Sequence, residues 1–204
     1  MGKRVLILAN SRKHTGRCVA GKDSDGNWIR LTKYGDGPIP IPEAANYNIL
    51  NVVEFEGLVN RPSINNNYHT ENSIYTGATL LGALSLDKLD VFLDKPMTIF
   101  GPDRLMDRED ADKLDHSLLF VKVQKFNISW IYCGTAQGYK LRADFFYNGM
   151  HYTDISVTDV YAESRFNALG MAYSEKYEEA YITVSLGVPY FGRTFKLISG
   201  IIVA

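Results

Sequence analysis

The fold is decided by the stretch GYKLRADFFYNGMHYTDISV at residues 138–157. At its centre, Asn148-Gly149 is the strongest short-range signal for a tight hairpin turn, because Asn and Gly tolerate the positive φ that such turns need. Apolar residues alternate on both sides, which predicts two antiparallel strands. Alternation places Phe145 and Tyr147 on one face and Phe146 on the other. One set fills a core, and the other is available for stacking or for packing against a further element.

The elements around this hairpin extend the pattern. TDVYAESRFNALG (158–170) predicts a helix capped by Thr158 or Asp159 and ended by Gly170. Further strands are predicted at 117–126, 181–186 and 194–204. The resulting order is three strands, a helix and two strands. This is the order of the OB-fold, a five-stranded Greek-key barrel with a helix between its third and fourth strands.

The first half contains strands of the same kind. They are predicted at 5–9, 17–21, 28–31 and 51–59. Loops at 33–50 and 60–79 are long, and the polar run RPSINNNYHTENS (61–73) is expected to be exposed. SLDKLDVFLD (85–94) predicts a short helix with Ser85 as its cap.

The acid-rich segment 101–117 is the best candidate for a domain boundary. With 204 residues, the chain is long enough for two small domains of roughly 100 residues each. We therefore expect an all-β protein with minor helices, built as two tandem OB-like five-stranded barrels. The first barrel is expected at 1–105 and the second at 106–204.

Composition excludes some classes of protein. Hydrophobic residues make up 46% and charged residues 22%, as in ordinary globular domains. The net charge of −1 argues against a general DNA-coating protein, which is normally basic. The amino-terminal region is locally basic, however, because no acid appears before Asp23. The basic residues that precede it are Lys3, Arg4, Arg12, Lys13, Arg17 and Lys22.

Cysteine and histidine usage indicates neither a disulfide framework nor a metal site. Cys18 and Cys133 are the two cysteines, and we expect both to be reduced. The four histidines form no closely spaced pair, so no metal ligands are predicted. The apolar run 5–9 is too short for a signal peptide, and no stretch approaches the roughly 20 apolar residues of a membrane span. We expect a cytoplasmic protein without a membrane partner.

The stretch GRCVAGKD (16–23) matches seven positions of the phosphate-binding loop G-x-x-x-x-G-K-[ST]. The eighth position is Asp23 instead of a hydroxyl residue. A working loop of this kind also needs a helix that begins at its lysine, whereas Lys22 precedes the turn signal DSDGN. We interpret the match as coincidental and 17–21 as a strand.

The connection SRKHTGR (11–17) offers many hydrogen-bond donors and no acid. This composition suits a phosphate, a nucleic-acid backbone or another anion. It also suits a solvated basic turn. Trp28 and Arg30 share one face of the next strand, where a ring and a charge can contact one ligand.

Two stretches of the chain resemble a known family. KRVLILANSRKHTGRCVAG and WIRL at the front, and YITVSLGVPYFGRTFKLISGII at the back, are similar to the bacterial dual OB-containing domain family. The resemblance implies tandem barrels over essentially the whole chain, and a link with nucleic-acid or nucleotide recognition in prokaryotic conflict and defence systems. The matching residues are Ser11, Lys13, Gly16, Arg17, Cys18, Gly21, Trp28, Arg30, Ser185, Pro189, Gly192 and Lys196.

These observations predict a protein that binds a nucleic acid or a nucleotide, without catalytic residues and without a cofactor. The candidate ligand-binding residues are Ser11, Arg12, Lys13, Arg17, Cys18, Lys22, Trp28, Arg30 and Lys196. Two alternatives stay open. The 11–30 region can be the active site of an enzyme acting on a nucleotide or nucleic acid, with Cys18 and His14 as nucleophile and base. The barrels can instead be an interaction module for a protein from the same operon.

Overall fold

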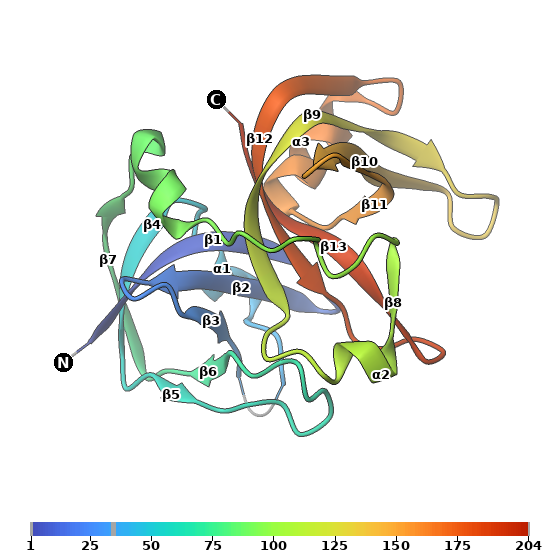
Figure 1. The fold of residues 1–204 in the computed structure, drawn as a ribbon. Helices are drawn as coiled ribbons and strands as arrows, with labels where there is room; N and C mark the ends of the chain where they lie inside the picture. The colour runs from blue at the N-terminus through green and yellow to red at the C-terminus, as the bar shows by residue number, and fades with distance from the viewer. Residues whose placement is uncertain (1, 34–35, 204) are drawn as a thin grey trace. The chain divides into compact units, whose positions relative to one another are not determined.

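The computed structural model describes residues 2–33 and 36–203, and it consists mostly of β-strands (Figure 1). The chain forms two compact units, each with its own curled sheet. The first unit comprises Met1–Leu93 and Glu109–Leu118, and the second comprises Asp94–Arg108 and Leu119–Ala204. The boundary expected between 105 and 106 falls inside a segment of the second unit, after which ten residues return to the first.

The first unit is a seven-stranded sheet in the order β5-β6-β3-β2-β1-β4-β7. Its elements are β1 (Lys3–Lys13), β2 (Gly16–Asp23), β3 (Trp28–Leu31), α1 (Ile41–Ala44), β4 (Asn51–Glu56), β5 (Val59–Asn60), β6 (Asn72–Ile74), β7 (Gly77–Ala83) and the 3₁₀ helix η1 (Leu86–Phe92). The core inside the sheet is aliphatic and aromatic. It includes Val5, Ile7, Val19, Ile29, Leu31, Val53 and Phe55.

Four of these strands behave as two interrupted long strands. β4 pairs with β7 up to Glu56↔Gly77, and β5 pairs with β6 from Val59↔Ile74 in the same register. β6 also pairs in parallel with β3, and β4 pairs with β1, which closes the ring. With α1 between β3 and β4, the unit has the element order of an OB-fold, so the predicted fold class is confirmed for the first unit.

Buried Asn10 holds α1 against the barrel. Its Nδ2 donates to Ala44 O and to Tyr47 O, both at 2.9 Å. Asn10 is 1% exposed, so these bonds replace water for the last carbonyl of α1 and for one three residues after it. The following segment is thereby fixed relative to β1.

The two glycines of GRCVAGKD have a packing reason that is unrelated to phosphate. A Cβ at Gly16 would lie 2.5 Å from Ile39 O, and one at Gly21 would lie 2.0 Å from Leu6 O. Both sites need the close approach of another backbone. Asp23 accepts from the backbone N–H groups of Asp25 and Asn27 and so caps the turn before β3. The interpretation of 17–21 as a strand is confirmed.

The expectation that 61–73 is exposed was wrong for about half of this run. Its buried residues are Ser63, Asn66, Tyr68, His69, Glu71, Asn72 and Ser73. Most of them are hydrogen-bonded within the unit, as when Asn72 Nδ2 donates to Asp36 Oδ1 at 2.8 Å, although Asn72 Oδ1 and Glu71 Oε2 are buried without a hydrogen bond to the described residues. A polar run is buried when the fold supplies its partners.

The second unit is a six-stranded sheet in the order β11-β10-β9-β12-β13-β8. Its elements are β8 (Leu105–Asp107), β9 (Leu118–Tyr132), β10 (Tyr139–Tyr147), β11 (Met150–Val157), α3 (Val160–Leu169), β12 (Ser174–Leu186) and β13 (Arg193–Ile202). The short helix α2 (Arg108–Ala111) spans the point where the chain passes from the second unit to the first. Parallel pairing of β11 with β13 closes the ring, which gives a second OB-like barrel.

The hairpin and helix signals of the second unit are confirmed. Asn148 and Gly149 both have positive φ between β10 and β11, and Gly170 ends α3 with φ 93°. Asp159 caps α3, since its Oδ1 accepts from Tyr161 N and Ala162 N. Ser85, in contrast, caps no helix by its side chain, because its hydroxyl bonds to Asp87.

Candidate ligand-binding site

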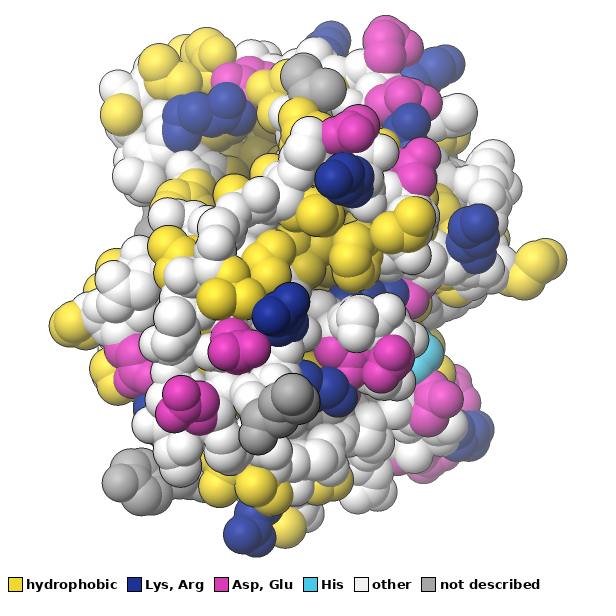
Figure 2. Space-filling view, turned by 90° about the vertical axis from the view of Figure 1, so that its left-hand side faces the viewer, with side chains coloured by type: hydrophobic (Ala, Val, Ile, Leu, Met, Phe, Trp, Pro, Cys, Tyr) yellow, Lys and Arg dark blue, Asp and Glu magenta, His cyan; other side chains and the backbone are white. Residues whose placement is uncertain are grey.

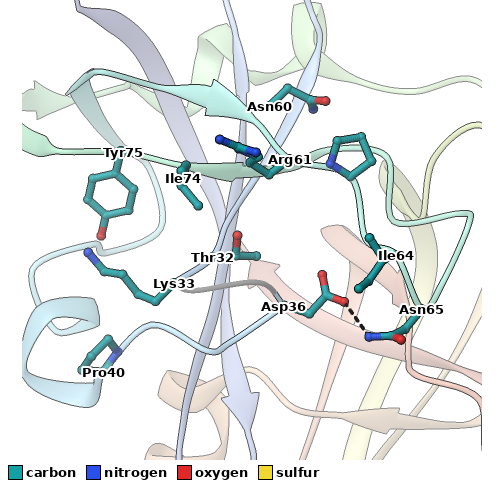
Figure 3. A pocket seen from close by; sticks show the side chains of 11 residues that line it. Thr32, Lys33, Asp36, Pro40, Asn60, Arg61, Ile64, Asn65, Ile74 and Tyr75 are labelled. Atoms are coloured by element: carbon teal, nitrogen blue, oxygen red, sulfur yellow. Dashed lines mark hydrogen bonds between the residues drawn. The ribbon is translucent and has the colours of Figure 1, made fainter.

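The first unit contains a cavity of about 980 Å³ (Figure 3). This volume is at the upper end of the range for small-molecule sites. Three segments line it: the residues after β3, the end of β5 with the loop that follows, and the end of β6. The lining residues are Thr32, Lys33, Asp36, Pro40, Asn60, Arg61, Pro62, Ile64, Asn65, Ile74 and Tyr75.

Strand pairing explains why these segments meet. β3 and β6 run in parallel, so that their ends at Leu31 and Ile74 lie at the same edge of the sheet. β5 is antiparallel to β6 and pairs Asn60 with Ser73, the residue that also faces Leu31, so the loop 61–71 leaves β5 only one strand away from the end of β3. In an OB-fold this loop connects strands four and five, and it is one of the loops that bind oligonucleotides and oligosaccharides.

Asp36 organises the wall of the cavity. Ser63 Oγ donates to its Oδ2 at 2.6 Å, and Asn72 Nδ2 donates to its Oδ1 at 2.8 Å. Asn65 Nδ2 lies 3.5 Å from Oδ2, the contact drawn in Figure 3. Lys13 Nζ donates to the Asp36 carbonyl at 2.8 Å. Asp36 thus fastens the segment after β3 to the loop 61–71.

A second polar cluster borders the cavity near Tyr75. Lys33 Nζ lies 3.0 Å from Glu43 Oε1 and 4.3 Å from the centroid of the Tyr75 ring. The Tyr75 hydroxyl donates to the same carboxylate, and the Tyr47 hydroxyl lies 3.2 Å from the Tyr75 hydroxyl. Burial, followed by the bond to Glu43, raises the pKa of Tyr75 above its ordinary value. Tyr75 is therefore a neutral donor at physiological pH.

Arg61 and Ile64 supply what a ligand would contact. Arg61 is exposed, and its guanidinium has no ion pair or hydrogen bond within 2–33 and 36–203. Ile64 is 93% exposed at the edge of the cavity. An apolar side chain in this position gains free energy when a partner covers it. The cavity therefore combines an available cation with available apolar surface.

The structure brings part of the predicted basic region to this cavity. Besides Lys13, the main chain of Arg17 is hydrogen-bonded in both directions to Ile39, at 2.8 and 2.9 Å. Arg12 lies directly opposite Arg17 in the β1–β2 pairing and is exposed. The hairpin end that carries these residues is thus attached to the segment that borders the cavity.

Lys22, Trp28 and Arg30 lie elsewhere and have partners inside the first unit. Lys22 is 3% exposed, and its Nζ donates to Phe92 O at 2.8 Å. Trp28 packs against the apolar cluster of Ala9, Ala20 and Leu118. Arg30 Nη2 lies 3.1 Å from Glu71 Oε1. None of the three lines the cavity.

The remaining candidates are also away from the cavity. Ser11 and Cys18 face each other across β1 and β2, with Ser11 buried and the free thiol of Cys18 half-buried. Lys196 belongs to the second unit and is 1% exposed, with its Nζ donating to Gly101 O. Burial lowers the pKa of Lys196 to about 8, against a smaller opposing effect of Asp103.

The cavity residues escaped sequence reasoning because they lie in the two loops that carry no motif. Lys33 and Asp36 belong to 33–50, and Arg61 belongs to 60–79. Loop length was the available signal, since loops longer than about 12–15 residues in compact domains are usually functional or disordered. On the face shown in Figure 2, Lys and Arg side chains are scattered among acids and apolar residues.

Comparison with known proteins identifies the architecture. A family model described as a dual OB-containing domain matches residues 3–201, which confirms the resemblance seen in the sequence. A search of the curated proteins found no match. Among the helices described, none has the length and apolar character that crossing a membrane requires.

Proposed function

Because the chain belongs to the dual OB-containing domain family, we propose that its first barrel binds a nucleotide, either free or as a unit of a nucleic-acid strand. OB-folds bind oligonucleotides through strands two and three and the loops between strands one and two and between four and five. In this barrel the cavity adjoins the loop 61–71 and the segment bound to the β1–β2 hairpin end. The site is thus where this fold usually meets its ligands.

The observation that carries the proposal is the exposed Arg61 beside apolar surface in a cavity of about 980 Å³. Arginine recognises phosphate through several parallel hydrogen bonds. Pro62, Ile64 and Ile74 offer apolar contact to a base or a sugar. A nucleotide presents both kinds of surface in one molecule.

The basic residues predicted as ligand contacts divide into two groups, one placed to meet a ligand and one bonded inside the units. Lys13, Arg12 and Arg17 are placed to meet a strand that extends beyond the cavity. Lys22, Arg30 and Lys196 stabilise their own units instead. A role within a prokaryotic conflict system is part of the proposal through the family resemblance alone, and action in the cytoplasm is part of it through the cysteine usage and the short apolar run 5–9.

Isothermal titration with nucleoside monophosphates and a short single-stranded oligonucleotide tests the proposal. Arg61→Ala should weaken binding by about tenfold or more, the loss of one charge-assisted hydrogen bond. The matched control is Arg4→Ala, because Arg4 is 71% exposed on β1 outside the cavity and pairs with Glu54. Absence of binding by the wild type, or equal losses in the two variants, would refute the proposal.

One observation favours a protein-interaction role as a second candidate function. β7 forms an edge of the first sheet, and six of its seven residues are exposed. Its sequence GATLLGA has neither charge nor proline, and Leu80 is 58% exposed. Such an edge pairs readily with a strand of another chain.

Light scattering over a range of concentrations tests this second role. Pairing through β7 between copies of the chain predicts a mass that rises with concentration and that Leu80→Lys returns to the monomer. Val91→Lys is the control, since Val91 is 83% exposed on η1. A monomeric wild type at all concentrations would contradict self-pairing.

A further inference from the structure

The charges around the cavity of the first barrel nearly cancel. Lys33 and Arg61 line the cavity, and Lys13 contacts its wall at Asp36 O. Asp36 also lines it, and Glu43 contacts both Lys33 and Tyr75. Three cations against two carboxylates leave one positive charge without a counter-charge.

The uncompensated charge belongs to Arg61. Lys33 Nζ is ion-paired with Glu43 Oε1 at 3.0 Å, and Lys13 Nζ donates to the main-chain carbonyl of Asp36. Within the described ranges 2–33 and 36–203, the guanidinium of Arg61 has no ion pair or hydrogen bond. Of the two cations that line the cavity, Arg61 is the one that can bind an anion without first breaking an ion pair.

The acids also limit how much negative charge the cavity accepts. Asp36 lines the cavity, and its carboxylate accepts from the uncharged donors Ser63 and Asn72. Glu43 contacts the lining residues Lys33 and Tyr75. Both carboxylates would repel a second or third phosphate that came within a few ångströms, and such repulsion is a general way of rejecting the wrong ligand. The cavity is therefore poorly suited to a polyphosphate.

Side-chain directions give the cavity two chemically different ends. In Figure 3, Lys33 and the guanidinium of Arg61 point toward Tyr75, whereas Asp36 and Asn65 lie together on the other side near Ile64. The two cations that line the cavity thus point toward one end. Asp36 and the amide of Asn65 lie beside the apolar Ile64 at the other, as a base edge and ring require.

Building on the proposed function, we infer that the cavity selects a nucleotide with one phosphate, held by Arg61 at the Tyr75 end, with its base near Ile64 and Asn65. The shared chemistry is a single phosphate group attached to a nucleoside. It is present in a free monophosphate and in the diester link of a nucleic-acid strand, and it distinguishes both from nucleoside triphosphates.

Titration of the full chain with AMP, ADP, ATP and the dinucleotide ApA, without divalent cations, tests this inference. AMP or ApA should bind about tenfold more tightly than ATP. A preference for ApA assigns the ligand to a strand, and a preference for AMP assigns it to a free nucleotide. Equal affinities, or tighter binding of ATP, would overturn the inference and leave the proposed function standing. Failure of all four ligands would overturn both.

Removing one acid supplies a second, independent measurement. Glu43→Gln keeps the size of the side chain and leaves a second positive charge uncompensated, so the preference for AMP over ATP should shrink by severalfold. Glu54→Gln is the matched control, because Glu54 lies on β4 outside the cavity and pairs with Arg4. An unchanged preference in Glu43→Gln would contradict the charge argument, provided that the variant retains the wild-type unfolding midpoint. Where it does not, Lys33→Met, which leaves Glu43 without its cation, should weaken the binding of ATP more than that of AMP.

Discussion

Arg30 Nη2 lies 3.1 Å from Glu71 Oε1, and both side chains are 3% exposed. The pair joins β3 to the end of the loop 61–71. Ser117 Oγ accepts a hydrogen bond from Arg30 at 2.7 Å and donates one to Glu71, which brings the returning segment 109–118 into the same cluster. Desolvation makes such a pair weak as a source of net stability but costly to break on one side only.

Arg30→Met is expected to destabilise the first unit by about 3–5 kcal/mol, because Glu71 is left as a buried and unpaired charge. Urea unfolding followed by Trp28 fluorescence in a Trp130→Phe background measures this unit alone. The double variant Arg30→Met with Glu71→Leu should recover most of the loss. A loss below about 1 kcal/mol in the single variant would show that the pair is solvated.

Asp36→Ala should loosen the wall of the cavity. It removes the acceptor of Ser63 Oγ and of Asn72 Nδ2, two groups in residues that are at most 9% exposed, at a cost of about 1–3 kcal/mol for each buried donor left unsatisfied. Hydrogen exchange of the amides in 61–67 should accelerate. Asp25→Ala, in an exposed turn, is the control, and unchanged exchange in Asp36→Ala would contradict the role of Asp36.

The stability of the second unit should fall as the pH rises from about 4 to about 6. Burial raises the pKa of Asp159 to about 6, against the opposing effect of hydrogen bonds from the backbone of Ala162, Ile201 and Tyr161. The folded state therefore binds a proton that the unfolded state has released, and stability is lost as the pH passes through the folded pKa.

Unfolding midpoints between pH 4 and 7, followed by Trp130 fluorescence in a Trp28→Phe background, measure this dependence. Asp159→Asn should flatten it. The free energy of unfolding of the variant should also fall by about 1–3 kcal/mol. Ile201 N donates to Asp159 Oδ2 at 2.8 Å, and an asparagine can place an amide N–H at this position, where it cannot accept the bond. An equally steep pH dependence in the variant would assign it to another group.

Lys196 predicts the opposite slope at alkaline pH. Its pKa in the folded state is about 8, below the value of roughly 10.4 for free lysine. Between these values the unfolded state binds more protons, so the stability of the second unit should rise with pH. Lys196→Met removes the titrating group at similar length. The free energy of unfolding of the variant minus that of the wild type should therefore decrease as the pH increases from 7 to 10, because only the wild type gains stability. A constant difference would contradict the lowered pKa.

Sequence reasoning succeeded where short-range physics decides the structure. Asn148-Gly149 needs only its own backbone preferences to form a turn, and Asp159 caps α3 through neighbouring N–H groups. The barrels follow from strand order and alternation. These signals lie within a few residues of each other and therefore survive without knowledge of the fold.

The candidate site depended on contacts that no local pattern reveals. Lys22 and Arg30 resemble surface cations in the sequence. Their partners, however, are Phe92 O and Glu71, which lie 70 and 41 positions further along the chain. Asp36 meets Ser63 and Asn72 in the same long-range manner. Only the closed barrel shows which charged side chains are bonded inside it and which, like Arg61, remain available to bind an anion.

The unbroken register from β4–β7 to β5–β6 has a consequence for how this barrel can change. Ring closure depends on paired backbones and on the anchors Tyr68 to Asn72, whereas 61–67 projects from the hairpin end that borders the cavity. Apart from the buried Ser63 and Asn66, residues there can be replaced without shifting a strand pairing. Under the proposed function we therefore expect recognition and architecture to be separable, so that a transplanted 61–67 segment that keeps Ser63 and Asn66 carries its own ligand preference into an unaltered barrel.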